Sequence, residues 1–407
     1  MKILHTADWH LGNVFHGHLR TDEHRHFLKW LLSVIEERQP DALLITGDVF
    51  DTANPSATAE ELFYDFLLQA TSLLPGLQVV ITAGNHDSAG RLEAPADLLK
   101  THNVYVRGTI HYLPKGEPDF GYYLLPLADR LTGQAACVCM ALPYLRSADA
   151  PAGLSPEEGL RFFFREIRRE LKHTEFDGLP VIAAAHFYTN GADICPDDHS
   201  ERVVVGGQEC VSPDVVGQGV SYTALGHIHK AQQAGPAAWY AGSALPMSFS
   251  EKGYRHGAQW VEIDEDGKAQ VSFVDYEPLR HLLTIPAHGR AASAQQVLDE
   301  IASLPLSSKQ TDRSAWPYLE IHVEERQPEP SLMNDVMQAL ADRAVCFCRM
   351  TRVRPAADGK ADAEKPATPD ALAATAPLDM ARQYFKSRFG EDMPEELVKR
   401  FEQAQDL

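Results

Sequence analysis

The sequence is short of cysteine and contains none of the cysteine pairs that structural zinc sites use. Its six cysteines are Cys137, Cys139, Cys195, Cys210, Cys346 and Cys348. No two of them form a Cys-x-x-Cys motif, so we do not expect a structural zinc site of the common type. The two Cys-x-Cys pairs lie inside strand-like apolar runs, where we expect the thiols to act as small buried hydrophobic groups.

Long apolar runs and an excess of positive charge are also missing. No uninterrupted apolar stretch approaches the ~18 residues of a membrane-spanning helix, and the opening residues lack the apolar core of a signal peptide. The chain has 37 Lys+Arg against 57 Asp+Glu, a formal net charge of −20. This argues against broad, autonomous binding to nucleic acid, which needs clustered cations, but not against a phosphate site whose positive charge comes from metal. We expect a protein of the reducing cytoplasm without membrane contact.

The first part of the chain alternates apolar runs with helical periodicity. The first predicted elements are strand 2–5, helix 22–38, strand 41–46, helix 57–74 and strand 77–81. Each strand is almost continuously apolar and is followed by polar residues, which is typical of parallel strands covered on both faces. Further strands are predicted at 104–106, 122–127, 136–142, 181–185, 222–225, 239–243, 259–263 and 271–276, with a helix at 156–173. These elements make up a first domain, residues 1–278.

A second, smaller domain is predicted over residues 279–354. Its elements are strand 281–285, helix 294–301, strand 318–323, helix 332–340 and strand 345–350. All five are short, and we interpret them as an α+β cap attached at one edge of the first domain.

The last part of the chain changes composition twice. Residues 355–377 are rich in Ala, Pro, Asp and Lys, which predicts a flexible linker. Residues 378–407 are amphipathic, with Leu378, Phe385 and Phe389 on one helical stripe. Such a short helical pair does not bury its stripe alone, so it docks either on its own domain or on a partner protein, and we favour the partner.

Side chains that bind metals follow five of the predicted strands. They are Asp8, His10, Asp48, Asn85, His86, His186, His227 and His229, with Asp51 nearby. A lone histidine is usually a satisfied polar residue, but eight such residues at strand ends are improbable by chance. Ligands gather at the carboxyl ends of parallel strands, and nitrogen and oxygen donors without thiolate suit Mn, Fe or Zn. The set is large enough for two ions bridged by a carboxylate, with Asp48 as the central candidate, and such a pair clamps a phosphoryl group.

Five motifs in one order resemble the calcineurin-like metallophosphoesterases. They are Asp8-x-His10, Gly47-Asp48-x-x-Asp51, Gly84-Asn85-His86-Asp87, the strand-end His186 and Gly226-His227-x-His229. The resemblance implies a four-layer α/β/β/α sandwich with a two-metal site at the strand ends.

The same resemblance implies a role for each residue. One ion would be held by Asp8, His10, Asp48 and His229, and the other by Asp48, Asn85, His186 and His227. His86 would assist the leaving group and Asp51 would orient His86. We expect Gly84 to permit the sharp exit from the strand and Asp87 to stabilise the turn.

Two further stretches, 1–12 and 240–249, resemble the bacterial nuclease subunits of this superfamily that work with an SMC-like ATPase. The resemblance implies a Mn²⁺-dependent DNA nuclease. Such an enzyme would be an exonuclease on double strands and an endonuclease on hairpins and single strands. It would serve DNA end processing, recombination and replication at the nucleoid. It implies that residues 378–407 grip the ATPase, and that a homodimer forms within a heterotetramer. Helices 22–38 and 57–74 are candidates for the dimer contact, although core packing explains their apolar faces equally well. Asp51 is a departure from the related archaeal and eukaryotic nucleases, which carry histidine there.

Other functions stay open at this point. A phosphatase or phosphodiesterase on the same scaffold would use the same metal chemistry, although the cap, linker and tail favour the nuclease. A non-catalytic DNA-end scaffold would be expected to have lost ligands, and none is missing. Possible DNA contacts are Arg20, Arg91 and the cations of 161–172, although for the last group a solvated helix face is the favoured interpretation.

Overall fold

The computed structural model describes most of the chain up to Val353. The described residues are 1–146, 148–151, 153–190, 192–193, 211–310, 312–325, 329–353 and the single positions 378, 382, 385, 393, 394, 397 and 398. The chain divides into two compact units, Met1–Val353 and Arg354–Leu407. The predicted linker 355–377 and nearly all of the predicted helical segment 378–407 lie outside the described residues, as do Cys195 and Cys210.

The first of two six-stranded sheets has the strand order β14-β13-β1-β4-β5-β6. Its strands are β1 (Lys2–Thr6), β4 (Ala42–Thr46), β5 (Gln78–Thr82), β6 (Val104–Arg107), β13 (His256–Ile263) and β14 (Ala269–Tyr276). β1, β4 and β5 are parallel, as their continuous apolar sequences predicted, and β6 continues the parallel arrangement. β13 and β14 come from later in the chain and extend the sheet in antiparallel fashion beside β1.

The second sheet has the strand order β11-β12-β10-β9-β8-β7. Its strands are β7 (Leu124–Ala128), β8 (Ala135–Ala141), β9 (Val181–His186), β10 (Tyr222–Gly226), β11 (Gln232–Gln233) and β12 (Ala238–Tyr240). β8, β9, β10 and β12 are parallel. The predicted strand from residue 122 begins instead with a 3₁₀ turn, Phe120–Tyr123.

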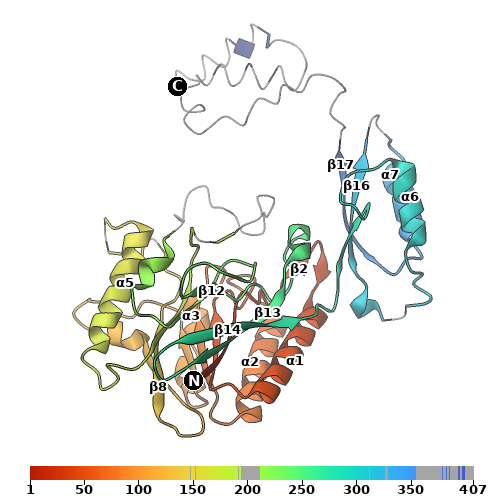
Figure 1. Cartoon of the computed structure of the whole chain (residues 1–407). Coiled ribbons are helices and arrows are strands. Elements are labelled where there is room, and N and C mark those ends of the chain that lie inside the picture. The colour runs from red at the N-terminus through yellow and green to blue at the C-terminus, as the bar shows by residue number, and fades with distance from the viewer. Residues whose placement is uncertain are drawn as a thin grey trace. The chain divides into compact units, whose positions relative to one another are not determined.

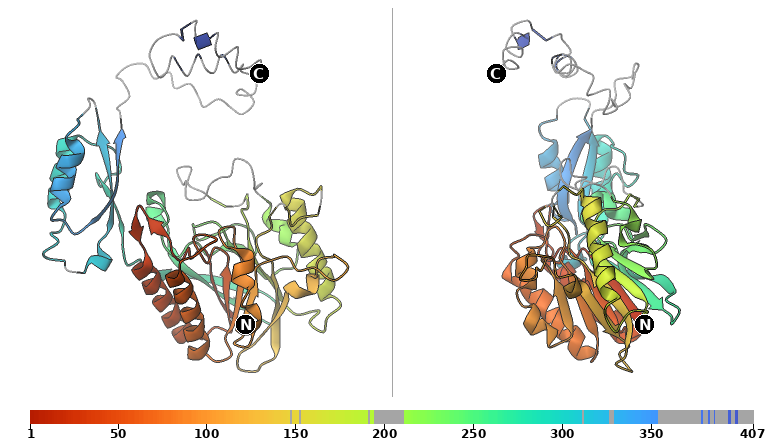
Figure 2. Two further views of the ribbon diagram at one scale, coloured as in Figure 1. Left: turned by 180° about the vertical axis from the view of Figure 1, so that it is seen from behind. Right: turned by 90° about the vertical axis from the view of Figure 1, so that its left-hand side faces the viewer.

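The two sheets pack face to face and helices cover both outer faces (Figures 1 and 2). α1 (Thr21–Arg38) and α2 (Ala57–Leu73) pack on the first sheet through a large apolar cluster, and α5 (Pro156–Leu171) packs on the second. A third cluster, which includes Leu44, Val80 and Ile182, fills the space between the sheets. The four-layer α/β/β/α sandwich is therefore confirmed.

One polar contact joins the two sheets inside this apolar layer. His5 of β1 is completely buried, and its ring lies 2.8 Å from the hydroxyl of Tyr222 and 2.9 Å from that of Thr46. Burial lowers the pKa of His5 to about 3, so the ring is neutral. A neutral imidazole has one donor and one acceptor nitrogen, and the two hydroxyls satisfy both.

The smaller domain contains a three-stranded sheet, β15 (Leu282–Ile285), β16 (Tyr318–Glu324) and β17 (Cys346–Val353), with α6 (Ala294–Ser303) and α7 (Leu332–Leu340). All three strands are parallel, so this part of the chain has α/β topology. The sequence-based assignment of these residues as α+β was therefore wrong. Each helix connects two parallel neighbours, which is the usual crossover. Both helices pack on one face of the sheet through residues such as Val297, Val336 and Ile321 (Figure 1).

A buried charged group joins the smaller domain to α1. Tyr318 donates a 2.6 Å hydrogen bond to the Glu23 carboxylate, and Arg20 binds the other oxygen of Glu23 at 2.7 Å. Arg20 also donates to the backbone carbonyl of Pro246 at 2.6 Å and is only 1% exposed. The suggestion that Arg20 contacts DNA was therefore wrong, because its guanidinium is buried against Glu23 and Pro246.

The remaining strands and α-helices are short. They are β2 (Val14–Phe15), β3 (His18–Leu19), α3 (Ala89–Glu93) and α4 (Ala96–Lys100). Two to five residues are too few for a periodic pattern, and the sequence did not predict them.

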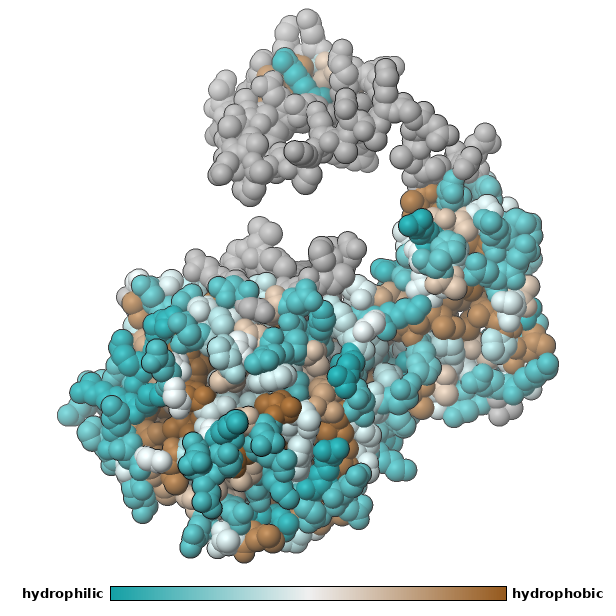
Figure 3. Space-filling view, in the orientation of Figure 1, coloured by the Kyte–Doolittle hydropathy of each residue, from teal (hydrophilic) through white to brown (hydrophobic). Residues whose placement is uncertain are grey.

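On the face drawn in Figure 3, hydrophilic side chains interrupt the apolar ones. Among the described residues, no helix has the length and apolarity needed to cross a membrane.

The four free cysteines in the described part of the chain differ in burial. Cys137 and Cys139 are completely buried in β8, as predicted, and burial raises the pKa of Cys137 to about 12. Cys346 and Cys348 of β17 are only half-buried. The first pair therefore acts as part of the apolar layer between the sheets.

We expect Phe163→Ala on α5 to lower the free energy of unfolding by about 3–5 kcal/mol, because it removes a large side chain from a close-packed core. Phe163 is 0% exposed, whereas its neighbour Phe162 only lines the same cluster. Phe162→Ala is the matched control, and urea denaturation of both variants measures the difference. Equal losses for the two variants would contradict the assignment of the buried face of α5.

Candidate metal centre

The side chains predicted from the sequence meet at the edge where the two sheets come together. The first sheet contributes Asp8, His10, Asp48, Asn85 and His86, and the second contributes His186, His227 and His229. β1, β4 and β5 are parallel neighbours, and so are β9 and β10, so their carboxyl ends lie side by side. Two different sheets therefore enclose one cluster of nitrogen and oxygen donors.

The backbone is strained at four of these positions. Asp8, His10 and Asp48 have φ of 51°, 47° and 46°, and His227 has φ of 102°. Side-chain-bearing residues rarely adopt this left-handed region, and each instance costs about 1–3 kcal/mol. Such strain persists where the surrounding structure fixes it, and it clusters at functional sites.

One group of donors consists of Asp8, His10 and His229, whose ligand atoms lie within 4.8 Å of one another. The rings of His10 and His229 are 5.2 Å apart at their centroids and nearly perpendicular, at 78°. All three residues are buried. Burial raises the pKa of Asp8 to about 7, which reflects the cost of an ionised carboxylate in this enclosed position.

A second group is centred on His186, where three electron-pair donors converge. The ring nitrogen Nδ1 of His186 lies 2.9 Å from the backbone carbonyl of Thr46, so it carries a proton. Nε2 then faces two acceptor oxygens, Asn85 Oδ1 at 2.9 Å and Asp48 Oδ2 at 3.4 Å. His227 also reaches Asn85 Oδ1, at 3.0 Å.

This convergence requires a positive charge. Burial works to lower the pKa of His186, but Asp48 and Asp8 outweigh it and raise the pKa to about 10. Without a proton or a metal ion on Nε2, the lone pairs of one nitrogen and two oxygens would oppose each other. The site is therefore built to hold cationic charge.

Asp48 lies between the two groups. Its buried Oδ2 has no hydrogen-bond partner in the described part of the chain, and it is 3.9 Å from His10 Nε2 and 3.4 Å from His186 Nε2. Its other oxygen accepts a 2.8 Å bond from the backbone N–H of His86. Burial would raise the pKa of Asp48, but His186, His10 and His86 outweigh burial and lower it.

Glycine is required at two positions by the close approach of these groups. A Cβ on Gly84 would lie 2.1 Å from Asp48 Oδ1, and a Cβ on Gly47 would lie 2.1 Å from His186 Nδ1. Gly84 therefore serves mainly to admit the Asp48 carboxylate. Asp87 accepts bonds from the backbone N–H groups of Gly84, Val49 and Phe50, at 2.9–3.2 Å, so it ties the two loops together.

His86 lies beside the donor cluster, with its ring 4.9 Å from that of His10. Its Nδ1 is 3.0 Å from the backbone carbonyl of Asp51, whereas the Asp51 carboxylate is 3.3 Å from His10 Nδ1 and 3.0 Å from Asn13 Nδ2. Asp51 thus contacts His86 through its main chain and His10 through its side chain. Because a carbonyl only accepts, Nδ1 of His86 carries a proton and Nε2 is the nitrogen left for a substrate.

Glu251 is a site residue that the sequence did not suggest. It is completely buried, its Oε1 lies 3.1 Å from His229 Nδ1, and its Oε2 accepts from the backbone N–H of Met247 at 2.7 Å. A carboxylate on one nitrogen of a metal-binding histidine fixes the tautomer and strengthens the other nitrogen as a donor. Glu251 stands in the polar stretch Ser-Glu-Lys, which has the composition of an exposed loop, so no sequence signal marked it.

The candidate DNA-contacting cations are mostly engaged with acids. On α5, Arg161 contacts Glu157 at 2.9 Å, and Arg165 contacts Glu166 at 2.8 Å. Arg91 lies 3.5 Å from Glu60. These contacts favour the solvated interpretation of α5.

Arg146 is different, because it lies next to the donor cluster. Its guanidinium donates to the backbone carbonyl of Asp87 at 3.3 Å. Tyr144, two residues earlier, has its ring 6.1 Å from that of His186. The loop after β8 therefore forms one rim of the cluster.

The donor set fits divalent metal ions. It offers imidazole nitrogens, carboxylate oxygens and one amide oxygen without thiolate, which suits ions such as Mn²⁺, Fe²⁺ or Zn²⁺. The buried Asp48 oxygen, which has no hydrogen-bond partner among the described residues, lies between the two groups of donors, where it could contact a metal ion. The geometry can therefore serve a reaction at a phosphate, whose negative charge needs compensation in a buried site.

Comparisons with known proteins agree with this chemistry. Residues 1–231 match the family model described as calcineurin-like phosphoesterase, and residues 278–389 match the one described as Type 5 capsule protein repressor C-terminal domain. The chain is 36% identical over 388 residues to SbcD, a subunit of the nuclease SbcCD, of Rhodobacter capsulatus, and the match covers 92% of this chain and 94% of the relative.

Two more relatives carry the same name. The Bacillus subtilis protein is 33% identical over 331 residues, with 79% of each chain covered. The Escherichia coli K12 protein is 34% identical over 266 residues, with 62% of each chain covered. From the family match over residues 1–231 and the likeness over nearly its whole length, the chain belongs to the calcineurin-like phosphoesterases and, within them, to the bacterial SbcD proteins.

Proposed function

We propose that this chain is a divalent-metal-dependent DNA nuclease that hydrolyses phosphodiester bonds with a two-metal site. Its substrates are the ends of double-stranded DNA, hairpins and single strands. It acts in DNA end processing, recombination and replication, in the cytoplasm at the nucleoid. The names of the relatives and the donor cluster support this proposal.

The convergence at Asp48 is the observation that carries the proposal. A buried carboxylate oxygen lies between His10 and His186, 3.9 Å and 3.4 Å from their Nε2 atoms. A carboxylate in such a position is suited to bridge two ions. A purely structural polar core would instead satisfy this oxygen with a hydrogen-bond donor.

The residues divide between two ions. We assign Asp8, His10, Asp48 and His229 to one ion, and Asp48, Asn85, His186 and His227 to the other. When bound, the ions, which we propose to be Mn²⁺, supply positive charge that offsets the negative charge of the phosphodiester. Asp48 and the neighbouring acids hold this charge in place, and the buried walls keep bulk water from screening it.

His86 is the proposed proton donor to the leaving oxygen. Its Nδ1 is held at 3.0 Å by the Asp51 carbonyl, which fixes the ring and directs Nε2 away from that carbonyl. A protonated Nε2 donates to the alkoxide that leaves when the P–O bond breaks. Asp51 assists by holding His10 with its carboxylate.

The partner of the chain is proposed to be an SbcC-type SMC-like ATPase. The name of the relatives describes one component of an SbcCD nuclease, which implies a second component for those proteins. We assign the contact to residues 378–407, reached through the linker 355–377, with the catalytic domain at 1–278 and the cap at 279–354. A homodimer of this chain within a heterotetramer is part of the same proposal, with α1 and α2 as candidate contacts.

Asp48→Asn should abolish Mn²⁺-dependent cleavage of hairpin DNA, and His86→Gln should reduce it strongly, for different reasons. Loss of the bridging charge should remove at least one ion, whereas loss of the proton donor should leave both ions bound and slow cleavage by about 10²–10⁴-fold. Metal analysis of the purified variants and single-turnover cleavage separate the two effects. Asp22→Asn, in an exposed pair with Arg25, is the matched control. Undiminished cleavage by Asp48→Asn would reject the two-metal account.

Glu251→Gln should weaken Mn²⁺ binding about 10–100-fold, since it removes the carboxylate that orients His229. Glutamine has nearly the same shape, so the fold should survive. Titration of Mn²⁺ followed by electron paramagnetic resonance measures the change, and Glu265→Gln in a surface loop is the control. An unchanged affinity would show that Glu251 does not act on the metal centre.

Removal of residues 378–407 should eliminate co-purification with the ATPase partner while Mn²⁺-dependent cleavage of hairpins by the chain alone persists. The physical reason is that an amphipathic segment beyond a linker contributes nothing to the catalytic core but offers a partner an apolar stripe. Co-expression pull-downs of the full and shortened chains measure the interaction. Full complex formation by the shortened chain would contradict the assignment.

A further inference from the structure

A cavity lies at the open edge of the sandwich, away from the metal donors. It has a volume of about 370 Å³ and lies between β6, the last strand of the first sheet, and β7, the last strand of the second. Helix α4 forms its rim. This volume is within the range of about 300–1,000 Å³ that is typical of small-molecule sites.

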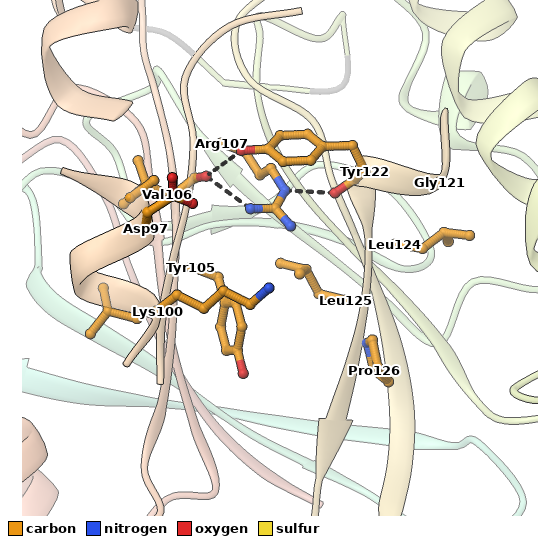
Figure 4. Close-up of a pocket in the computed structure, with 12 residues that line it drawn as sticks. Asp97, Lys100, Tyr105, Val106, Arg107, Gly121, Tyr122, Leu124, Leu125 and Pro126 are labelled. Carbon is orange, nitrogen blue, oxygen red and sulfur yellow. Dashed lines mark hydrogen bonds between the residues drawn. The ribbon is translucent and has the colours of Figure 1, made fainter. Parts of the chain in front are cut away.

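Arg107 forms the upper wall of this cavity (Figure 4). It is 8% exposed, donates from Nε to the carbonyl of Tyr122 at 2.7 Å, and its guanidinium lies 3.9 Å above the Tyr122 ring. Its Nη1 donates to the carbonyl of Val106, at 2.9 Å. Both acceptors are neutral, so a nearly buried cation here has no carboxylate in direct contact among the described residues.

The nearest buried acid is already committed to other groups. Glu93 accepts from Tyr122 at 2.7 Å and from the backbone of Thr109 at 3.0 Å, and it lies 3.2 Å from His111. It attracts Arg107 only at longer range. Burial lowers the pKa of Arg107, although Tyr122 and Glu93 act to raise it. A buried charge without a direct counterion is costly, and a bound anion would remove that cost.

A second cation faces the same space. Lys100 is an exposed residue of the cavity lining, and Figure 4 draws its ammonium group beneath the guanidinium of Arg107. In the described part of the chain Lys100 makes no ion pair, although the protein as a whole carries 57 acids against 37 bases. Asp97 is the one carboxylate that lines the cavity, at the α4 rim, and it forms no ion pair with either cation among the described residues.

The rest of the lining is mostly apolar and includes two aromatic rings, Tyr105 and Tyr122. Val104, Leu124, Leu125 and Pro126 line the cavity, and Figure 4 shows Tyr105, Leu125 and Pro126 below Arg107. Both faces of the Tyr122 ring are occupied, by Arg107 and by His111, whose ring stacks at 3.9 Å. Tyr105 has no ring partner among the described residues; it packs partly against the apolar layer between the sheets and also lines the cavity.

From these contacts we infer that the cavity between β6 and β7 binds a nucleoside monophosphate, with the phosphate between Lys100 and Arg107 and the base on Tyr105 and the apolar lining. A phosphate monoester carries close to two negative charges near neutral pH, which matches the two cations. A single inorganic anion would leave the apolar part of the cavity empty. The site shares no residue with the metal centre and does not depend on the proposed nuclease activity.

The test is calorimetric titration of the full chain with deoxyadenosine 5′-monophosphate in EDTA, so that metal-mediated binding does not contribute. Lys100→Gln should weaken binding about tenfold, the size expected for one charged hydrogen bond. Tyr105→Leu keeps an apolar side chain and should weaken binding about tenfold through lost stacking. Lys115→Gln, an exposed lysine in a turn, is the matched control and should bind like the wild type.

Two further ligands test the two halves of the site. Deoxyadenosine, which lacks the phosphate, and inorganic phosphate, which lacks the base, should each bind at least about tenfold more weakly than the monophosphate. Absence of monophosphate binding by the wild type, equal affinity in Lys100→Gln, or equal affinity for inorganic phosphate would each overturn the assignment. Both variants lie outside the metal centre, so retained hairpin cleavage verifies their folding.

Discussion

The metal centre depends on one electrostatic constraint, the convergence of acceptor atoms at the carboxyl ends of five strands. Asn85, Asp48 and His186 direct oxygen and nitrogen lone pairs at one another in a buried space. In water such groups would repel each other only weakly, but in a low-dielectric interior the repulsion is large. The fold can hold this arrangement only with cationic charge present. A cluster that served stability alone would not bring so many acceptor atoms together.

The backbone is organised to keep these groups together. Left-handed φ values at Asp8, His10 and Asp48 turn the chain sharply at the point where each strand ends. Gly47 and Gly84 lie where any larger residue would collide with a ligand side chain. The large apolar clusters on both sides of the two sheets supply the rigidity that offsets this local strain.

Much of the fold and the site could be predicted because the sequence pattern is local. The continuous apolar residues of β4 and β5 predicted buried parallel strands, and the polar residues that follow them predicted where ligands gather. Glu251 and Arg20 could not be predicted in the same way. Each stands among polar neighbours that are typical of a surface, and each is buried because a distant segment covers it. The parallel order of β15, β16 and β17 follows from their crossover helices, and the α+β assignment gave too little weight to that alternation.

The contact between His86 and Asp51 has a consequence for substitutions at position 51. The atom that holds His86 is a main-chain oxygen, and every amino acid supplies one. Position 51 can therefore change its side chain without removing the carbonyl that holds His86, whereas the contacts of the carboxylate with His10 and Asn13 would be lost. In the proposed mechanism, a different side chain at position 51 would change the environment of His10 and leave the hydrogen bond to His86 in place. Position 51 would then act on the metal donors through its side chain, and on the proposed proton donor only through its backbone.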